Sequence, residues 1–375
     1  MATTDTLSDH VVRRRQALAH SVTPRTWRDA ALTLNRTNAA VWVPIRVGLA
    51  IAVVLVVGGL AGRTDVAGFA ALGALTSAFC RADAYRIRLP KLMVTAGTLT
   101  GFVVLGGILG ATGASMPVQI VAMSAASAVA VLILGAARVV GPGPVVMLFA
   151  AAGAVTFASS AGDVVTATVA AILGAMVGIG ASLAPWLFER VRGIGSAGGS
   201  RGTLWADLRR VGDRDLLVSA ARIAIACGLA AGVAAGVGLS HPMWAAMGAM
   251  ATLQGLNFHH TVHRGVQRLI GNVVGAMIAA ALLALPLGYW GAVVLIVLLQ
   301  TAAEILVAVN YGMCSMAVTP MALLLTALGA GLTSDVALDR VADTALGVVF
   351  GIIVGALTIA RHDTAHHSPG VATAR

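Results

Sequence analysis

Long apolar stretches separated by short polar clusters run along the chain, and their order occurs twice. Residues 42–187 read as six apolar segments, and residues 216–360 read as six more in the same arrangement. Stretches of about 18 residues or more can cross a ~30 Å hydrocarbon core as helices. The pattern therefore predicts an all-α polytopic membrane protein with about twelve transmembrane helices, arranged as two six-helix repeats.

Sequence landmarks recur in the two halves in the same order. Residues 69–75 correspond to residues 244–250, and a Gly-x-x-x-Gly motif at residues 97–101 corresponds to one at residues 271–275. Many transporters use repeats of apolar helices to build a path around a pseudo-symmetry axis. The repeat therefore bears on function as well as on fold.

The periodicity places each span only approximately. The first repeat is expected to have its spans near 42–61, 66–80, 91–111, 118–137, 139–160 and 164–187. The second is expected to have them near 216–238, 242–256, 265–285, 290–308, 312–332 and 338–360. Only Arg138 and the Gly-Pro-Gly-Pro sequence at 141–144 separate the fourth and fifth spans, so ten or eleven spans remain an alternative.

Composition and charge agree with a membrane protein. Of the 375 residues, 58% are hydrophobic and 11% are charged, whereas soluble domains carry about 25% charged residues. The net charge is +10, but the basic residues cluster between apolar spans, so the positive-inside rule explains them better than nucleic-acid binding does. With the N-terminus inside, every Lys and Arg except Arg63 and Arg340 falls on the cytoplasmic side.

This distribution supports twelve spans with both termini in the cytoplasm. An even number of spans in each half makes the two repeats parallel, related by an axis along the membrane normal. The expected organisation is a cytoplasmic N-terminal segment (1–41), a first membrane repeat (42–187), a cytoplasmic linker (188–215), a second membrane repeat (216–360) and a cytoplasmic tail (361–375).

The spans near 66–80 and 242–256 are short and occupy the same place in their halves. Short or interrupted segments in corresponding positions are a sign of a transporter binding site. The second of them begins at His241-Pro242 and includes Trp244, and the span near 312–332 contains Thr319-Pro320. Either these features kink helices around a substrate path, or they serve ordinary packing.

Polar residues at helical spacing mark one face of the span near 265–285. His260, Arg264, Arg268 and Asn272 step by four residues and form one stripe. This stripe is either a basic vestibule that attracts organic anions, or topogenic charge that snorkels to the interface. Arg46 and Arg222 repeat at the inner ends of the first and seventh spans, where they line either a shared path or the membrane interface.

Two further groups of charges lie within or beside apolar spans. Glu304 is the only acidic residue well inside a predicted span, so it is either a proton-coupling site or the ion-pair partner of Arg268 or Arg222. The last span opens with several charges. Either Arg340 forms a structural ion pair with Asp339 or Asp343, or these residues take part in function.

Motifs for other classes of protein are absent from the sequence. It contains no phosphate loop, no His-Glu-x-x-His and no Gly-x-Ser-x-Gly. Its three cysteines are far apart and show no metal-ligand spacing. We therefore expect no enzyme activity, no ATP-driven transport, no cofactor and no metal site. The lipid bilayer is the expected environment, and nucleic acid is not an expected partner.

The second half resembles the fusaric acid resistance protein-like (FUSC) family. The resemblance lies in five blocks in the family's order, at residues 241–246, 263–275, 304–312, 318–323 and 339–347. It implies a bacterial inner-membrane protein of the aromatic acid exporter superfamily, which exports aromatic carboxylic acids with the proton gradient. This chain departs from the large exporters because no sizeable cytoplasmic domain separates its halves. The motif positions carried over are Arg264, Arg268, Glu304, Asn310, Thr319, Pro320, Arg340 and Asp343.

The sequence thus predicts a proton-coupled secondary transporter that exports small organic or aromatic carboxylic acids. A passive organic-anion channel and a non-transporting envelope or scaffold protein are the alternatives. The Gly-x-x-x-Gly faces serve either a homodimer or contacts within the chain. The candidate residues of the substrate path are Arg46, Arg222, His241, Trp244, Arg264, Arg268, Asn272, Glu304, Asn310, Thr319, Pro320, Arg340 and Asp343.

Overall fold

A computed structural model describes residues 7–34, 41–191, 209–255, 257–330 and 336–359 of the protein. Within these residues the chain is helical and contains no strand. The predicted tail at 361–375 and most of the predicted linker lie outside the described residues. The described fold therefore agrees with the predicted all-α class.

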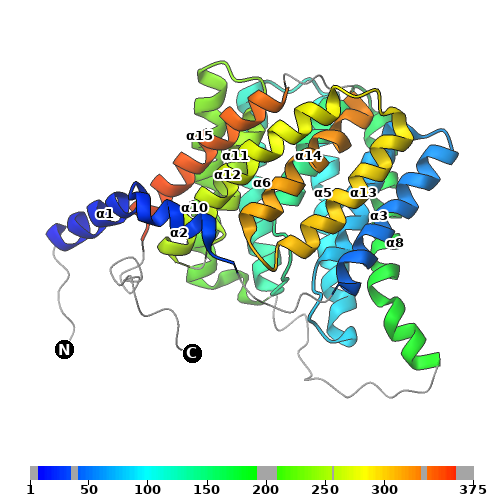
Figure 1. The fold of residues 1–375 in the computed structure, drawn as a ribbon, viewed down its shortest axis with the longest axis horizontal. Helices are drawn as coiled ribbons and strands as arrows, with labels where there is room; N and C mark the ends of the chain where they lie inside the picture. The colour runs from blue at the N-terminus through cyan, green and yellow to red at the C-terminus, as the bar shows by residue number, and fades with distance from the viewer. Residues whose placement is uncertain (1–6, 35–40, 192–208, 256, 331–335, 360–375) are drawn as a thin grey trace.

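Helices of very different length make up the bundle (Figure 1). The N-terminal part and the first half contain α1 (Leu7–Ser21), α2 (Pro24–Leu32), α3 (Trp42–Leu60), α4 (Thr64–Ala74), the 3-10 helix η1 (Leu75–Ala78), α5 (Tyr85–Ala111), α6 (Met116–Ala136), α7 (Val145–Phe157) and α8 (Ala161–Val191). The second half contains η2 (Arg209–Gly212), α10 (Arg214–Gly236), α11 (Pro242–Leu253), α12 (Phe258–Leu283), α13 (Gly288–Leu306), α14 (Tyr311–Ala330) and α15 (Val336–Leu357).

Nine helices in the described residues are long and apolar enough to cross a membrane. They are α3, α5, α6, α8, α10, α12, α13, α14 and α15. The protein is therefore a multi-pass membrane protein, as predicted. Helices α4, α7 and α11 have 11, 13 and 12 residues, and at 1.5 Å per residue each is shorter than the ~30 Å core. The predicted number of about twelve spans therefore stays a prediction: nine of the described helices are long enough to span, and α4, α7 and α11 are short.

The fifth predicted span, near 139–160, is wrong at its start. Helix α7 begins only at Val145 because the preceding Gly-Pro-Gly-Pro sequence has no helical backbone. Pro142 and Pro144 have no N–H to donate, and Arg138 and Gly143 have φ values of +50° and +88°. The segment is tied down where the Cys80 N–H donates to the Val140 carbonyl at 2.7 Å.

The same pairs of helices pack together in both halves. Helix α4 packs against α8, and α11 packs against α15. A Cβ atom on Gly174 of α8 would collide with the Ala70 carbonyl, and one on Gly347 of α15 would collide with the Ala245 carbonyl. Small residues therefore let α4 and α8 approach closely at their backbones, and likewise α11 and α15.

The Gly-x-x-x-Gly landmarks do not make equivalent contacts. Gly271 of α12 lies against the Gly312 carbonyl of α14. In the first half, α5 makes the matching contact with α7 through Gly106 against Ala151. A Cβ atom added to Gly97 or Gly101 would meet no atom within 4 Å. The sequence match between residues 97–101 and 271–275 therefore does not predict which face of each helix packs against its neighbour.

Helices α1 and α2 lie against one end of the second half (Figure 1). Ala17 and Ala30 are fully buried in a small apolar cluster with Phe258, Val262 and Ala356. The Gln267 side chain also donates a hydrogen bond to the Ala30 carbonyl at 2.8 Å. The N-terminal segment is thus packed onto α12 and α15 by both apolar and polar contacts.

Candidate functional site

A cavity of about 400 Å³ lies between the two halves of the chain, and we call it the basic cavity. The second half contributes residues from α12, α13 and α14, and the first half contributes η1, the start of α7 and the irregular segments beside them. Its polar lining is Arg81, Arg264, Arg268, Gln300, Glu304, Tyr311 and Ser315. Most of the remaining lining is apolar, so the cavity combines an excess of positive charge with a hydrophobic wall.

Glu304 is buried in this wall and forms an ion pair with Arg81. Its other carboxylate oxygen accepts a hydrogen bond from the Gln300 amide at 2.8 Å. The sequence predicted Arg268 or Arg222 as the partner, and that prediction is wrong. Arg222 is half-buried on α10 and does not line the cavity. The pair matters because Arg81 belongs to the first half and Glu304 to the second.

The two arginines of the predicted stripe both line the basic cavity and meet at Tyr311. The Arg264 guanidinium lies over the Tyr311 ring at 4.1 Å, which is within the range of a cation–π contact. Arg268 donates a hydrogen bond to the Tyr311 hydroxyl at 3.2 Å. The Nε of Arg268 is buried and has no hydrogen-bond partner among the described residues. Arg268 therefore lines the cavity while one of its buried donors is left unpaired.

The polar stripe continues beyond the cavity toward Thr319. The Asn272 amide donates to the Thr319 hydroxyl at 3.3 Å, and that hydroxyl donates to the Ser315 carbonyl at 2.8 Å. The Oδ1 of Asn272 is buried without a hydrogen-bond partner in the described part of the chain. Pro320 is buried inside α14, where it leaves the carbonyl four residues earlier without its helical donor. These residues lie behind the cavity wall.

Asn310 has a capping role at the start of α14. Its Oδ1 accepts hydrogen bonds from the N–H groups of Gly312 and Met313 at 2.7 and 3.2 Å. Its amide donates to the Thr33 carbonyl at 2.8 Å. Asn310 does not line the basic cavity, so it positions α14 and the chain after α2.

A second polar cluster joins the starts of α11 and α15. The His241 ring stacks on Trp244 with centroids 4.1 Å apart, and the Arg340 guanidinium lies over the same indole at 4.7 Å. The His241 Nδ1 lies 3.6 Å from a carboxylate oxygen of Asp339. Burial lowers the pKa of His241 below its ordinary value, although Asp339 acts in the opposite direction.

The predicted ion pair of Arg340 with Asp339 or Asp343 is wrong. No ion pair of Arg340 within 4.0 Å occurs among the described residues, and its cation rests on Trp244 instead. Asp343 is fully buried, and neither of its carboxylate oxygens has a hydrogen-bond partner in the described structure. None of the residues of this second cluster lines the basic cavity.

Arg46 lies in a different neighbourhood, near the start of α3. It is half-buried, and Arg81, Tyr85 and Arg88 are its charged and titratable neighbours. Its Nε and Nη2 have no hydrogen-bond partner among the described residues. It does not line the basic cavity, so the structure separates Arg46 and Arg222 from Arg264, Arg268 and Glu304.

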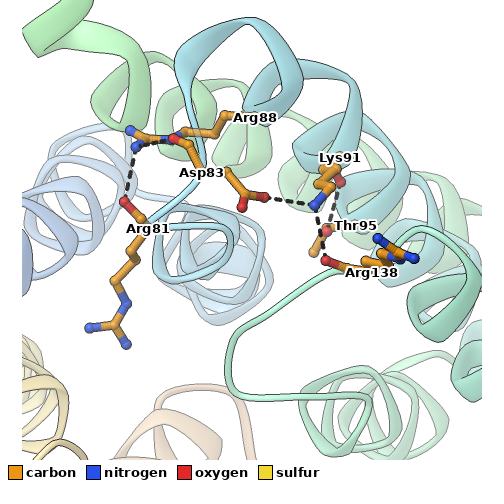
Figure 2. Close-up of polar contacts among 6 residues, drawn as sticks. All are labelled: Arg81, Asp83, Arg88, Lys91, Thr95 and Arg138. Carbon is orange, nitrogen blue, oxygen red and sulfur yellow. Dashed lines mark hydrogen bonds and ion pairs between the residues drawn. The ribbon is translucent and has the colours of Figure 1, made fainter. Parts of the chain in front are cut away.

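Sequence reasoning missed Arg81 and the network that positions it (Figure 2). Arg88 donates hydrogen bonds to the carbonyls of Asp83 and Arg81, the latter at 2.9 Å. Lys91 donates to the Asp83 carboxylate at 2.9 Å and to the Arg138 carbonyl at 3.0 Å. In Figure 2 the Arg81 side chain points away from this network. The sequence shows only a cluster of basic residues here, which the positive-inside rule explains without any further role.

The described fold and cavity define an all-helical multi-pass membrane protein with a basic cavity between its halves. The model of the fusaric acid resistance protein-like family matches residues 226–354. This match confirms the resemblance seen in the sequence, and it covers α11 to α14, most of α15 and the second half of α10. All of the second-half residues that line the basic cavity therefore lie in the matched part.

One curated relative is an uncharacterized membrane protein, YvaC, of Bacillus subtilis (strain 168). It is 29% identical over 141 residues, which are 37% of this chain and 22% of that protein. The chain thus matches about a fifth of the length of this relative. No solved structure matches the chain.

Proposed function

We propose that the protein is a secondary transporter that exports small organic anions, in particular aromatic carboxylic acids, through the basic cavity. The observation that carries the proposal is the set of three arginines and one glutamate on the cavity wall between the halves. The family match supports transport as the class of function.

The lining of the basic cavity suits an aromatic carboxylate. Its volume of about 400 Å³ lies within the range of about 300–1,000 Å³ typical of small-molecule sites. Arginine guanidinium groups bind carboxylates through parallel hydrogen bonds, and Arg81, Arg264 and Arg268 line the cavity. The apolar side chains of Val145, Val318 and Met321 line the same cavity and would bury the ring of the substrate.

Glu304 would couple transport to protons. While ionised, its carboxylate occupies Arg81. Either a proton on Glu304 or a substrate carboxylate on Arg81 would break this pair, so the proton and the anion would bind in turn. The anion would move outward and a proton inward in alternate halves of the cycle, and the inward proton gradient would thus drive export.

The proposed architecture is two parallel repeats of six helices in the bacterial inner membrane, with both termini in the cytoplasm. The direction of packing supports it. Gly106 and Gly110 of α5 lie against Ala151 and Val155 of α7, so these helices run parallel. The contacts between α12 and α14 show that these two helices also run parallel. Helix α4 likewise runs parallel to α8, and α11 runs parallel to α15. The short helices α4, α7 and α11 thus preserve the alternation of direction.

Transport in proteoliposomes tests the proposed function. Purified protein is expected to move aromatic carboxylates saturably under an imposed pH gradient. Arg268→Gln and Glu304→Gln are expected to lower the rate at least about tenfold, the loss that corresponds to about 1.4 kcal/mol. Arg86→Gln is the matched control because Arg86 is exposed and lies outside the cavity lining.

Two results would contradict the proposal. If no aromatic acid moves under any gradient, the transport function is wrong. If anion current flows without a pH gradient and Glu304→Gln does not alter it, the protein is a passive channel and the coupling role of Glu304 is wrong.

A further inference from the structure

A second cavity, of about 320 Å³, lies against α4, α7 and α14. We call it the phenylalanine cavity because Phe69, Phe149 and Phe157 line it. The rings of Phe69 and Phe157 meet edge to face with centroids 5.1 Å apart. Asp65 and Thr156 contribute polar atoms to its wall. Such a wall suits the ring of an aromatic anion, since aromatic rings favour edge-to-face contact.

Both cavities follow the same face of α4 and η1. Asp65, Phe69 and Leu72 line the phenylalanine cavity, and Leu75 and Ala78 line the basic cavity. These positions are three or four residues apart, so they form one stripe along a continuous helical segment. The two cavities therefore lie in sequence along this stripe.

Helices α7 and α14 repeat this arrangement. On α7, Val146 lines the basic cavity and Phe149 lines the phenylalanine cavity. On α14, Met321 lines the basic cavity and Leu325 lines the phenylalanine cavity. All three helices thus pass from one cavity to the other within about one turn, which is ~5 Å of helix.

Apolar side chains fill the short interval between the cavities. Leu72, Leu75, Met321 and Leu325 are all at most 6% exposed. A Cβ atom on Gly68 of α4 would lie 3.5 Å from the Leu325 carbonyl, so α4 and α14 are in contact at this level. A narrow apolar constriction of this kind excludes water and blocks charged solutes until it opens.

We infer that the two cavities are the two ends of one substrate path and that Leu72, Leu75, Met321 and Leu325 form its closed gate. The inference rests on the proposed transport function for its substrate, an aromatic carboxylate. The basic cavity binds the carboxylate, and the phenylalanine cavity receives the ring after the gate opens. Opening requires α4 with η1 to move relative to α14, because these elements carry the four gate side chains.

Cysteine modification from each side of the membrane tests the path without any need for transport. All three cysteines are buried, but Cys314 lines the basic cavity and Cys80 and Cys227 do not, so these two are replaced by Ser. The probe is sulfonatoethyl methanethiosulfonate, a membrane-impermeant organic anion, and intact-protein mass spectrometry measures its addition. In the parent protein, Cys314 is expected to react only with reagent on the basic-cavity side.

The double variant Leu72→Ala/Leu325→Ala removes two gate side chains. It is expected to make Cys314 react at least about tenfold faster with reagent on the phenylalanine-cavity side, because an apolar constriction gates by excluding water. Leu148→Ala/Leu323→Ala is the matched control. Both of its leucines are buried on the same helices as the path but line neither cavity.

A variant with one introduced cysteine and unchanged gate residues tests the path even if the gate variant misfolds. Thr156→Cys, without native cysteines, is expected to react only from the phenylalanine-cavity side. The inference is overturned if Thr156→Cys reacts equally from both sides. It is also overturned if Cys314 stays protected in a folded gate variant, or if the control variant exposes Cys314 equally. Labelling as expected without acid transport would leave the path intact and refute only the proposed function.

Discussion

At the scale of single residues, the Arg81–Glu304 pair stands out because it joins the two halves inside the basic cavity. The Glu304 side chain is 5% exposed and that of Arg81 is 26% exposed. A carboxylate buried to this degree is costly unless it is paired or protonated. Arg81 therefore serves both as a stabilising partner of Glu304 and as a cation in the candidate binding site.

Removing one partner of this pair is expected to destabilise the fold. Arg81→Met leaves the Glu304 carboxylate buried without its cation, and loss of one partner of a buried ion pair costs about 3 kcal/mol or more. The double variant Arg81→Met/Glu304→Gln is expected to recover most of that loss. Thermal unfolding in lipid nanodiscs measures both. Equal stability of the single and double variants would contradict a direct interaction.

His241 is expected to make stability depend on pH. Burial lowers its pKa in the folded protein, so the unfolded chain binds the proton more readily. The neutral ring therefore contributes stability above the unfolded pKa of about 6.5, and this contribution is lost as the pH falls through the folded pKa. Melting temperatures from pH 7.5 to 5 should fall more steeply for wild type than for His241→Gln. Parallel curves would exclude this role.

The residues of the candidate site were only partly predictable. Helical spacing correctly placed Arg264 and Arg268 on one face, because that spacing is a local property of a helix. The same reasoning could not find Arg81 as the partner of Glu304, since the pair forms only when the two halves pack. Asn310 lies in a family motif, but its side chain caps α14.

At the scale of helices, the short elements α4, α7 and α11 position the cavities. Hydrophobic periodicity found all three, but it overestimated the length of α7 because Gly and Pro residues replace the first turns. The break supplies part of the basic cavity, whose lining includes Gly141 and Pro142. A helix of full length would fill this region with its own backbone.

Backbone contact between α11 and α15 is expected to make Gly347 intolerant of a side chain. Gly347→Ala places a Cβ atom against the Ala245 carbonyl, and overpacking of this kind typically costs about 1–3 kcal/mol. Gly232→Ala on α10 is the matched control because nothing lies within 4 Å of its Cβ position. The yield of monodisperse protein and its melting temperature measure the effect. A neutral Gly347→Ala would contradict the close approach.

At the scale of the whole molecule, the alternating direction of the helices determines where the chain ends lie. If only the nine long helices crossed the membrane, the number of crossings would be odd. The start of α3 and the end of α15 would then lie on opposite sides. The short helices α4, α7 and α11 add three reversals. In the proposed architecture, which counts all of them, the start of α3 and the end of α15 would lie on the same side.

Reporter fusions are therefore expected to place both termini on one side of the membrane, and the positive-inside rule assigns that side to the cytoplasm. A fluorescent reporter fused to either end should fold, and a periplasmic phosphatase fused to either end should stay inactive. A fusion at residue 114, between α5 and α6, should give the opposite result. Termini on opposite sides would refute the proposed parallel repeats.

Hydropathy and motif patterns were enough to predict the membrane class, the order of the helices, the resemblance to the fusaric acid resistance protein-like family and the face that carries Arg264 and Arg268. These properties depend on local periodicity and on the apolar length needed to cross a bilayer. The packing of the folded chain was needed to show that Arg81 meets Glu304, that Arg340 rests on Trp244, and that two cavities follow one stripe on α4. Such contacts join residues far apart in the chain, and their geometry depends on close helix packing that hydropathy does not encode.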